Sequence, residues 1–202
     1  MNMRRYHCLF LQGQMQIGKS TLLLDSLRPF LSVTGGFMVQ RLRQKSQPRG
    51  FCLQAVADIP LEAEICAEQK ANNVFIEIGD QGACFHPEVF EQVGSELLLA
   101  SEGKKLIYLD EIGGIELLSD LFRQNLYRVL AGPVPCIGVI KSLSNSNVMQ
   151  KGMQIDPIYK DLQQQLFTDI KERFNGCILN LANDNRAQIQ QAVDQFLQIH
   201  MI

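Results

Sequence analysis

Residues 13–20 read G-Q-M-Q-I-G-K-S and constrain the fold more tightly than any other segment of the chain. They fit the pattern G-x-x-x-x-G-K-[ST] at every fixed position, with an apolar run before them and leucines at helical spacing after them. Glycine permits backbone dihedrals that turn amide hydrogens toward an anion, and the following helix directs the positive end of its dipole at the same point. This context favours a phosphate-binding loop over a glycine-rich turn without a ligand.

Each fixed position of the loop has a chemical reason. Lys19 supplies a point charge to the β- and γ-phosphates of a nucleotide, and the hydroxyl of Ser20 is a ligand for Mg²⁺. The sequence therefore predicts a magnesium ion as cofactor and a nucleoside triphosphate as the bound partner. We expect these residues to line the phosphates: Gly13, Gln14, Met15, Gln16, Ile17, Gly18, Lys19, Ser20 and Thr21.

A second signal is the apolar run 106–109, which ends in Asp110 and Glu111. A carboxylate at the tip of a buried strand can reach the hydrated Mg²⁺ held by Ser20, which predicts Asp110 as a metal residue. Glu111 can then orient or deprotonate a water in line with the γ-phosphate, as a catalytic residue. Glu116 has two readings: an acid favoured by the dipole of a first helical turn, or a further catalytic group for the water or the metal.

Transfer of a γ-phosphoryl group also needs positive charge where negative charge develops. Lys141 follows a predicted strand, at the edge where ligands bind in parallel sheets. Residues 180–186 follow the last predicted strand; they either lie near a nucleobase or form a polar turn in which Asn183 or Asp184 caps the final helix. The candidate cations are Arg41, Arg43, Arg49, Arg123, Lys141 and Arg186.

Apolar runs and helical patterns alternate along the chain, which predicts an α/β fold with a mainly parallel sheet and helices on both faces. Two strand-like stretches around a polar turn predict an antiparallel hairpin. A length of 202 residues favours a single domain over 1–202. The expected strands are 6–11, 36–42, 50–56, 74–78, 106–109, 134–140 and 177–181, the expected helices 21–31, 87–101, 115–130, 157–174 and 186–199, and 142–152 is an expected loop.

Composition excludes several classes of function. The net charge of −2 argues against a nucleic-acid partner, which would require a basic face. No apolar run is long enough to span a membrane, and no signal peptide is recognisable, so we expect a cytoplasmic protein with no membrane partner. The six cysteines and three histidines lack zinc-site spacing, so we expect reduced, mostly buried thiols and no protein-built zinc site.

Together these residues resemble a known family, the small P-loop nucleoside-triphosphatases typified by a thermophilic bacterial enzyme and a human cancer-related relative. Residues 110–117 read D-E-I-G-G-I-E-L, and the family motif is D-E-I-G-x-M-E-L. Further similar stretches are Gly36-Phe37 with Arg43 and Gly50-Phe51, then Phe122-Arg123, and residues 181–186, L-A-N-D-N-R against L-T-x-x-N-R. The resemblance therefore covers nearly the whole chain.

The resemblance implies the three-layer P-loop sandwich and Mg²⁺-dependent hydrolysis of nucleoside triphosphates to diphosphate and phosphate, with loose base preference. It assigns phosphate and metal to Lys19 and Ser20, the metal shell to Asp110 and the attacking water to Glu111, and Glu116 matches the second family Glu. Two stretches depart from the pattern. Gln16 stands where the family usually has Gly, with Ser20 for Thr, and residues 39–43, V-Q-R-L-R, replace T-E-E-x-R.

Two alternatives remain open on the same fold. A nucleotide or small-molecule kinase would pass the phosphoryl group to an acceptor, but no cluster of arginines follows Lys141 to form a closing lid. A nucleotide-gated binding module would turn over slowly and signal to a protein partner. Gln16 and the altered hairpin keep this second alternative in consideration.

Overall fold

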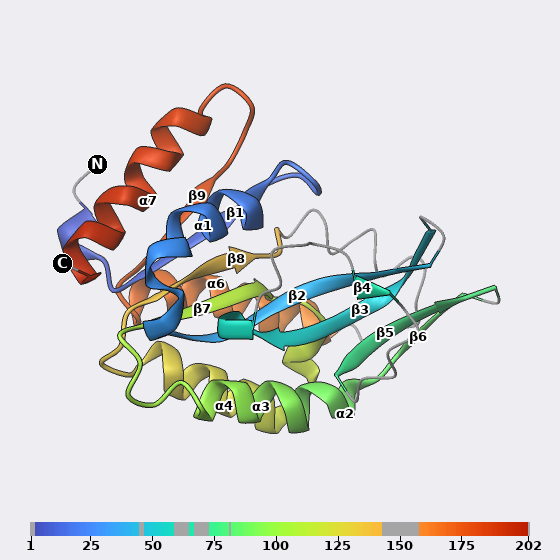
Figure 1. Ribbon diagram of the computed structural model, residues 1–202. Helices are drawn as coiled ribbons and strands as arrows, with labels where there is room; N and C mark the ends of the chain where they lie inside the picture. Colours follow the sequence, from blue (N-terminus) through green and yellow to red (C-terminus); the bar gives the residue numbers. More distant parts are fainter. Residues whose placement is uncertain are drawn as a thin grey trace.

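A computed structural model of the chain describes residues 3–44, 47–58, 65–66, 73–80, 82–142 and 158–201. One mixed sheet runs through it, with strand order β6-β5-β3-β2-β7-β8-β1-β9 and β4 paired to β2 (Figure 1). The pairs from β2 to β9 are parallel, and those from β2 to β6 are antiparallel. The strands are β1 Cys8–Gln12, β2 Thr34–Gln44, β3 Gln47–Ala55, β4 Ile65–Cys66, β5 Val74–Gly79, β6 Gly82–Phe85, β7 Leu106–Ile112, β8 Cys136–Ile140 and β9 Gly176–Asn180.

Helices cover both faces of this sheet, so the predicted three-layer sandwich is confirmed (Figure 1). On one face, α1 Lys19–Leu27 and α7 Arg186–Met201 pack their apolar side chains against β1, β7 and β8. On the other face, α4 Asp120–Leu130, α6 Ile158–Glu172 and the run from α2 Pro87–Val89 to α3 Ser95–Leu99 enclose a second apolar cluster. The antiparallel hairpin of β2 and β3 is also confirmed, and β5 and β6 extend it.

Three predicted helices differ from the observed ones. The expected helix 115–130 is divided into a 3₁₀ turn, Ile115–Leu118, and α4, because Ser119 adopts an extended backbone and caps α4 with its hydroxyl. The helix expected over 21–31 ends at Leu27 and continues as the 3₁₀ segment Arg28–Val33, since Pro29 has no amide hydrogen for an α-helical bond. Within the helix expected over 87–101, Phe90–Gly94 is wound as a π-turn.

Two short strands were not predicted. β6 is a four-residue, largely exposed strand, and the two-residue β4 is shorter still, so neither carries an apolar pattern that predicts it. All but the first residue of the loop expected over 142–152 lies outside the described residues.

The topology brings the predicted motifs to one edge. β8 lies between β1 and β7, and all three strands are parallel, so their carboxyl ends meet there. The phosphate-loop motif, Lys141 and the acids of residues 110–116 follow or end these three strands. The register between β7 and β8 shifts between Leu109 and Ile112, directly at the acids.

Candidate active site

The loop between β1 and α1 has the backbone that its glycines predict. Gly13 has φ +146° and is so close to the next segment that an added Cβ would lie 2.5 Å from the Leu181 carbonyl oxygen. Gly18 has φ +88° at the start of α1. Gln16 has φ +61°, a left-handed conformation that costs an L-residue roughly 1–2 kcal/mol. Position 16 therefore has a backbone conformation that glycine would adopt without this cost, and Gln16 adopts it with a side chain.

Lys19 lies across the mouth of this loop. Its Nζ donates hydrogen bonds to the carbonyl oxygens of Gly13 at 3.1 Å and Gln14 at 2.7 Å. Burial lowers the pKa of the Lys19 ammonium, and the carboxylates of Glu111 and Asp110 partly oppose this shift. The lysine and the two acids of β7 therefore share one electrostatic environment, as the sequence predicted. The loop tip is open, since Met15 is 71% exposed and Gln14 and Thr21 are also exposed.

Ser20 and Asp110 form the link between α1 and β7. The Ser20 hydroxyl donates to Asp110 Oδ1 at 3.0 Å, and the backbone N–H of Val39 donates to Oδ2 at 3.1 Å. Asp110 is 2% exposed, and burial, together with the charge of Glu111, raises the pKa of its carboxyl. A buried carboxylate and a hydroxyl at this separation are oxygen donors of the kind Mg²⁺ prefers, so the residues fit the predicted ion.

Glu111 has φ +53° at the register shift of β7. Strained backbone at a non-glycine residue is found most often at functional sites, where the side chain must be aimed in one direction. Glu111 is half-buried, and its charge acts on both Lys19 and Asp110. Glu111 therefore lies in the same electrostatic environment as Lys19 and Asp110.

Glu116 follows Glu111 by five residues and lies in the 3₁₀ turn after β7. It is 2% exposed, and its Oε1 accepts a hydrogen bond from the Gly114 N–H at 2.7 Å. Within the described part of the chain, its Oε2 has no hydrogen-bond partner. A Cβ added to Gly114 would lie 2.8 Å from that oxygen and 2.6 Å from Lys141 Nζ. Glu116 and Lys141 therefore converge on one glycine at the carboxyl edge of β8.

Arg186 also reaches the phosphate loop. Its guanidinium donates to the Ile17 carbonyl oxygen at 3.2 Å, from the first residue of α7. The residue before α7 is Asn185, not Asn183 or Asp184 as expected for the cap. The Asn185 side chain accepts from the Ala182 N–H at 2.8 Å and donates to the Asn180 carbonyl at 2.9 Å. It thereby fixes the turn that carries Arg186 to the loop.

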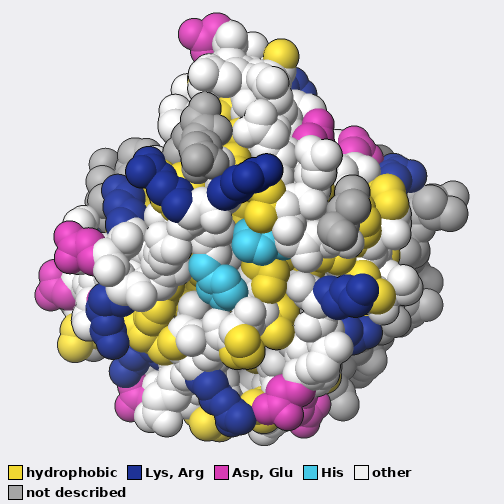
Figure 2. Space-filling model, turned by 90° about the vertical axis from the view of Figure 1, so that its left-hand side faces the viewer, with side chains coloured by type: hydrophobic (Ala, Val, Ile, Leu, Met, Phe, Trp, Pro, Cys, Tyr) yellow, Lys and Arg dark blue, Asp and Glu magenta, His cyan; other side chains and the backbone are white. Residues whose placement is uncertain are grey.

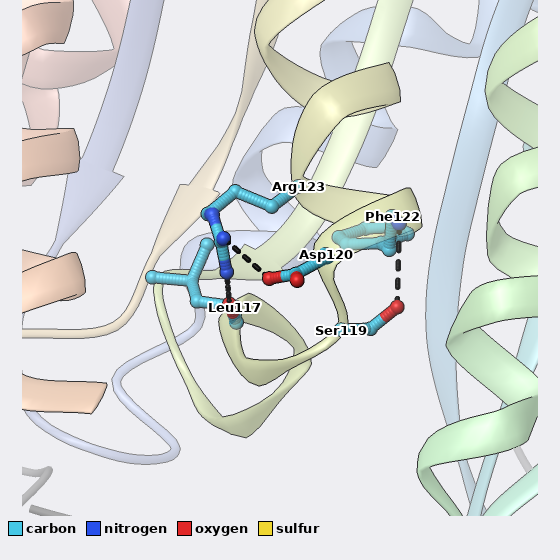
Figure 3. A network of polar contacts seen from close by, with 5 residues as sticks. All are labelled: Leu117, Ser119, Asp120, Phe122 and Arg123. Atoms are coloured by element: carbon cyan, nitrogen blue, oxygen red, sulfur yellow. Dashed lines mark hydrogen bonds and ion pairs between the residues drawn. The ribbon is translucent and has the colours of Figure 1, made fainter. Parts of the chain in front are cut away.

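The remaining candidate arginines are placed elsewhere. The Arg41 guanidinium stacks 5.6 Å from the centre of the Phe51 ring, on the sheet face opposite the phosphate loop. Arg49 pairs with Asp80 at 3.4 Å, and Arg43 lies opposite Pro48 near the turn of the hairpin. Arg123 donates to the Leu117 carbonyl and to Asp120 Oδ1, each at 2.5 Å (Figure 3). These four arginines do not form a cluster at the carboxyl edge.

Arg123 instead joins the 3₁₀ turn that carries Glu116 to the first turn of α4, beside the Ser119 cap (Figure 3). We expect Arg123→Ala to destabilise the fold by about 1–3 kcal/mol, because the Leu117 carbonyl loses a charged donor. Urea unfolding measures this loss. The matched control is Arg128→Ala, which removes only an exposed pair with Glu102 and should leave the midpoint nearly unchanged. Equal urea midpoints for the two variants would show that Arg123 does not stabilise the junction between the 3₁₀ turn and α4.

Sequence reasoning missed three buried polar groups. Tyr108 is fully buried on β7, and burial and the charge of Asp110 raise the pKa of its phenol. Gln163 of α6 donates from Nε2 to the Lys141 carbonyl at 3.0 Å and so supports the end of β8. Gln40 of β2 is 3% exposed. Tyr108 lies within the apolar run that ends in Asp110, and period-two alternation with Asp110 was the signal that could have placed it near the site. Gln40 lies within residues 39–43, the stretch that departs from the family pattern, and Gln163 belongs to no motif.

The opposite end of the sheet differs in character. Figure 2 faces this end, where histidine side chains lie at the centre and charges of both signs are spread around them. His7 Nε2 lies 3.0 Å from the Gly132 carbonyl oxygen, and His200 Nε2 lies 3.0 Å from that of Tyr6, so both rings are held by backbone.

Of the cysteines whose surroundings are described, Cys84 is exposed and four are buried. In the described segments, no helix is long and apolar enough to cross a membrane.

The sheet order, the glycine loop between β1 and α1, and the acid at the end of β7 define a P-loop nucleotide-binding protein. The sequence profile of the family described as NTPase matches residues 8–193. The chain therefore belongs to the NTPase family, and its enzyme class is that of the nucleoside-triphosphatases.

Solved and curated proteins agree with this placement. The chain is 24% identical over 161 residues to the nucleoside-triphosphatase THEP1 of Thermotoga sp. (strain RQ2), and 25% identical over 161 residues to that of Thermotoga maritima. Each alignment covers 78% of this chain and 87% of the relative. The fold resembles THEP1 from Aquifex aeolicus with TM-score 0.60, 17% identity and coverage of 96% and 99%. It also resembles a human cancer-related nucleoside triphosphatase with TM-score 0.61, 22% identity and coverage of 96% and 97%.

Proposed function

We propose that this chain hydrolyses nucleoside 5′-triphosphates, ATP and GTP among them, to the diphosphate and inorganic phosphate in a Mg²⁺-dependent reaction. The observation that carries the proposal is the 3.0 Å hydrogen bond from Ser20 to Asp110, with Glu111 beside it. It brings together the hydroxyl at the start of α1 and the acids at the end of β7. The proposal treats residues 1–202 as one catalytic unit that acts in the cytoplasm, without nucleic acid or membrane.

Each residue has a defined task in this reaction. The loop amides and Lys19 bind the phosphates, and Lys19 exchanges its carbonyl contacts for phosphate oxygens. Ser20 and Asp110 would hold Mg²⁺, which would supply positive charge to neutralise the phosphates. Glu111 accepts a proton from water as the water oxygen attacks the γ-phosphorus and the bond to the bridging oxygen breaks. Lys141, with Glu116 beside it, supplies positive charge at the same edge.

A phosphate-release assay with ATP, GTP, CTP and UTP, with and without Mg²⁺, tests the proposal. We expect release with several bases and its loss when Mg²⁺ is chelated. Labelled ATP separated by thin-layer chromatography distinguishes hydrolysis from transfer, since a kinase would leave the label on an acceptor. Turnover slower than minutes with tight nucleotide binding would instead support the binding module.

Lys19→Ala is the first variant to test. Loss of a charge-assisted contact of about 1.5–3 kcal/mol predicts a roughly 10- to 100-fold weaker affinity for triphosphate, with phosphate release lost as well. Isothermal titration with a non-hydrolysable ATP analogue measures the affinity. The control is Lys104→Ala, since Lys104 donates only to the Ser32 carbonyl at 3.3 Å on the surface. Wild-type affinity in Lys19→Ala would remove the loop from the binding site.

A further inference from the structure

Gln40 on β2 is a buried carboxamide that the described part of the structure leaves without a hydrogen bond. It is 3% exposed, and neither its Nε2 nor its Oε1 has a partner. A buried polar group left unpaired costs about 1–3 kcal/mol. Such a group requires an explanation, and a catalytic role is among the recognised ones.

The strand register places Gln40 next to the proposed metal site. The N–H of Val39, the preceding residue, donates to Asp110 Oδ2 at 3.1 Å. Phe37 pairs with Leu109 in the parallel register of β2 and β7, so Gln40 lies three positions farther along, past Asp110 and toward the carboxyl edge. This is the edge at which the phosphate loop and Glu111 lie.

The alternation of β2 also fixes the face on which Gln40 lies. Met38 belongs to the apolar cluster with Leu22 and Leu23 of α1. Gln40 is two residues on in the same regular pairing with β3, so it shares that face. Arg41 lies on the other face, over Phe51. The carboxamide is therefore on the side of the sheet that carries the phosphate loop.

We propose that Gln40 is a further catalytic residue: its Oε1 holds the attacking water, and its Nε2 donates to a γ-phosphate oxygen only as the γ-phosphoryl group is transferred. This inference rests on the proposed hydrolysis. The water donates one hydrogen to Oε1 and keeps it, while the other proton passes to the Glu111 carboxylate. The water oxygen bonds to the γ-phosphorus, and the diphosphate leaves with the electron pair of the broken bond.

Charge explains why an amide suits this position. Asp110 and Glu111 are neighbouring carboxylates at the end of β7, so they repel one another when both are ionised. A third carboxylate beside them would add to this repulsion, whereas a carboxamide donates and accepts hydrogen bonds without charge.

The test is Gln40→Leu, with Gln40→Met as a second variant that preserves side-chain length. We expect kcat to fall about 100-fold, with KM and the affinity for a non-hydrolysable ATP analogue changed less than about twofold. Affinity for ADP with aluminium fluoride and Mg²⁺, which imitates the γ-phosphoryl group in transfer, should fall by the same factor as kcat. Thermal melting of each variant confirms that it is folded.

Gln54→Leu is the matched control. Gln54 Oε1 is also buried without a hydrogen-bond partner among the described residues, but Gln54 lies on β3 opposite Met38, one strand farther from Asp110. We expect wild-type kcat in this variant. A folded Gln40 variant with wild-type kcat would overturn the inference, as would equal losses of affinity for the two analogues. Absence of phosphate release from the wild-type enzyme would instead refute the proposed hydrolysis itself.

Discussion

Glu111→Gln is expected to lower kcat for phosphate release by about 1,000-fold, because loss of a general base typically costs 10²–10⁴ in rate. Nucleotide affinity should stay at the wild-type value, since Lys19, Ser20 and Asp110 are retained. Single-turnover hydrolysis of labelled ATP measures the chemical step, and titration with a non-hydrolysable analogue measures binding. The two readouts separate proton acceptance from phosphate binding. Lys19→Ala cannot separate them, because it is expected to lose both.

Two controls accompany this variant. Glu102→Gln removes an exposed carboxylate of the same kind, which pairs with Arg128 on the surface, so it should leave kcat unchanged. Glu111→Gly relieves the φ of +53° and should also lose activity, while its thermal stability stays at or above the wild-type value. Full activity in Glu111→Gln would exclude this carboxylate from the mechanism. A large loss of stability in Glu111→Gly would show that the strained backbone serves the fold instead.

The glycine loop of residues 13–20 and the position of Asp110 beside it could be predicted from the sequence, because each depends on local requirements. Position 18 requires a positive φ, which glycine permits. Ser20 brings a hydroxyl to the first turn of α1, and Asp110 lies at the end of a buried strand. The parallel order of strands then brings these ends together, as the alternation of strand and helix implied. The contact between Ser20 and Asp110 follows from pattern and topology alone.

Other features depend on contacts between distant residues, which a single sequence does not reveal. The helical period over 115–130 is real, but it concealed the break at Ser119, where a side-chain cap outweighs the period. Arg186 reaches Ile17 only because Asn185 fixes the turn after β9. We single out Gln40 because its carboxamide is buried and has no hydrogen-bond partner among the described residues. Neither property can be inferred from the fact that residue 40 is a glutamine.

Gly36→Ala is expected to destabilise the fold strongly. Gly36 pairs with Tyr108 across β2 and β7, with φ +92°, and an added Cβ would lie 2.0 Å from the Tyr108 carbonyl oxygen. Overpacking against rigid backbone and the left-handed conformation together predict a loss of about 3 kcal/mol or more. Total stabilities are typically about 5–15 kcal/mol, so urea unfolding should show a clear fall in the midpoint.

The same substitution should also weaken the site, because β2 and β7 hold Asp110 in place through the Val39 N–H. We therefore expect Gly36→Ala to lose affinity for the triphosphate analogue in the presence of Mg²⁺ at temperatures where it remains folded. Gly79→Ala is the matched control on β5, where an added Cβ would meet only the Gly82 carbonyl oxygen, at 3.9 Å. Its stability should remain within about 0.5 kcal/mol of wild type. If Gly36→Ala had the same urea midpoint as the wild type, the close contact between β2 and β7 would not be what positions Asp110.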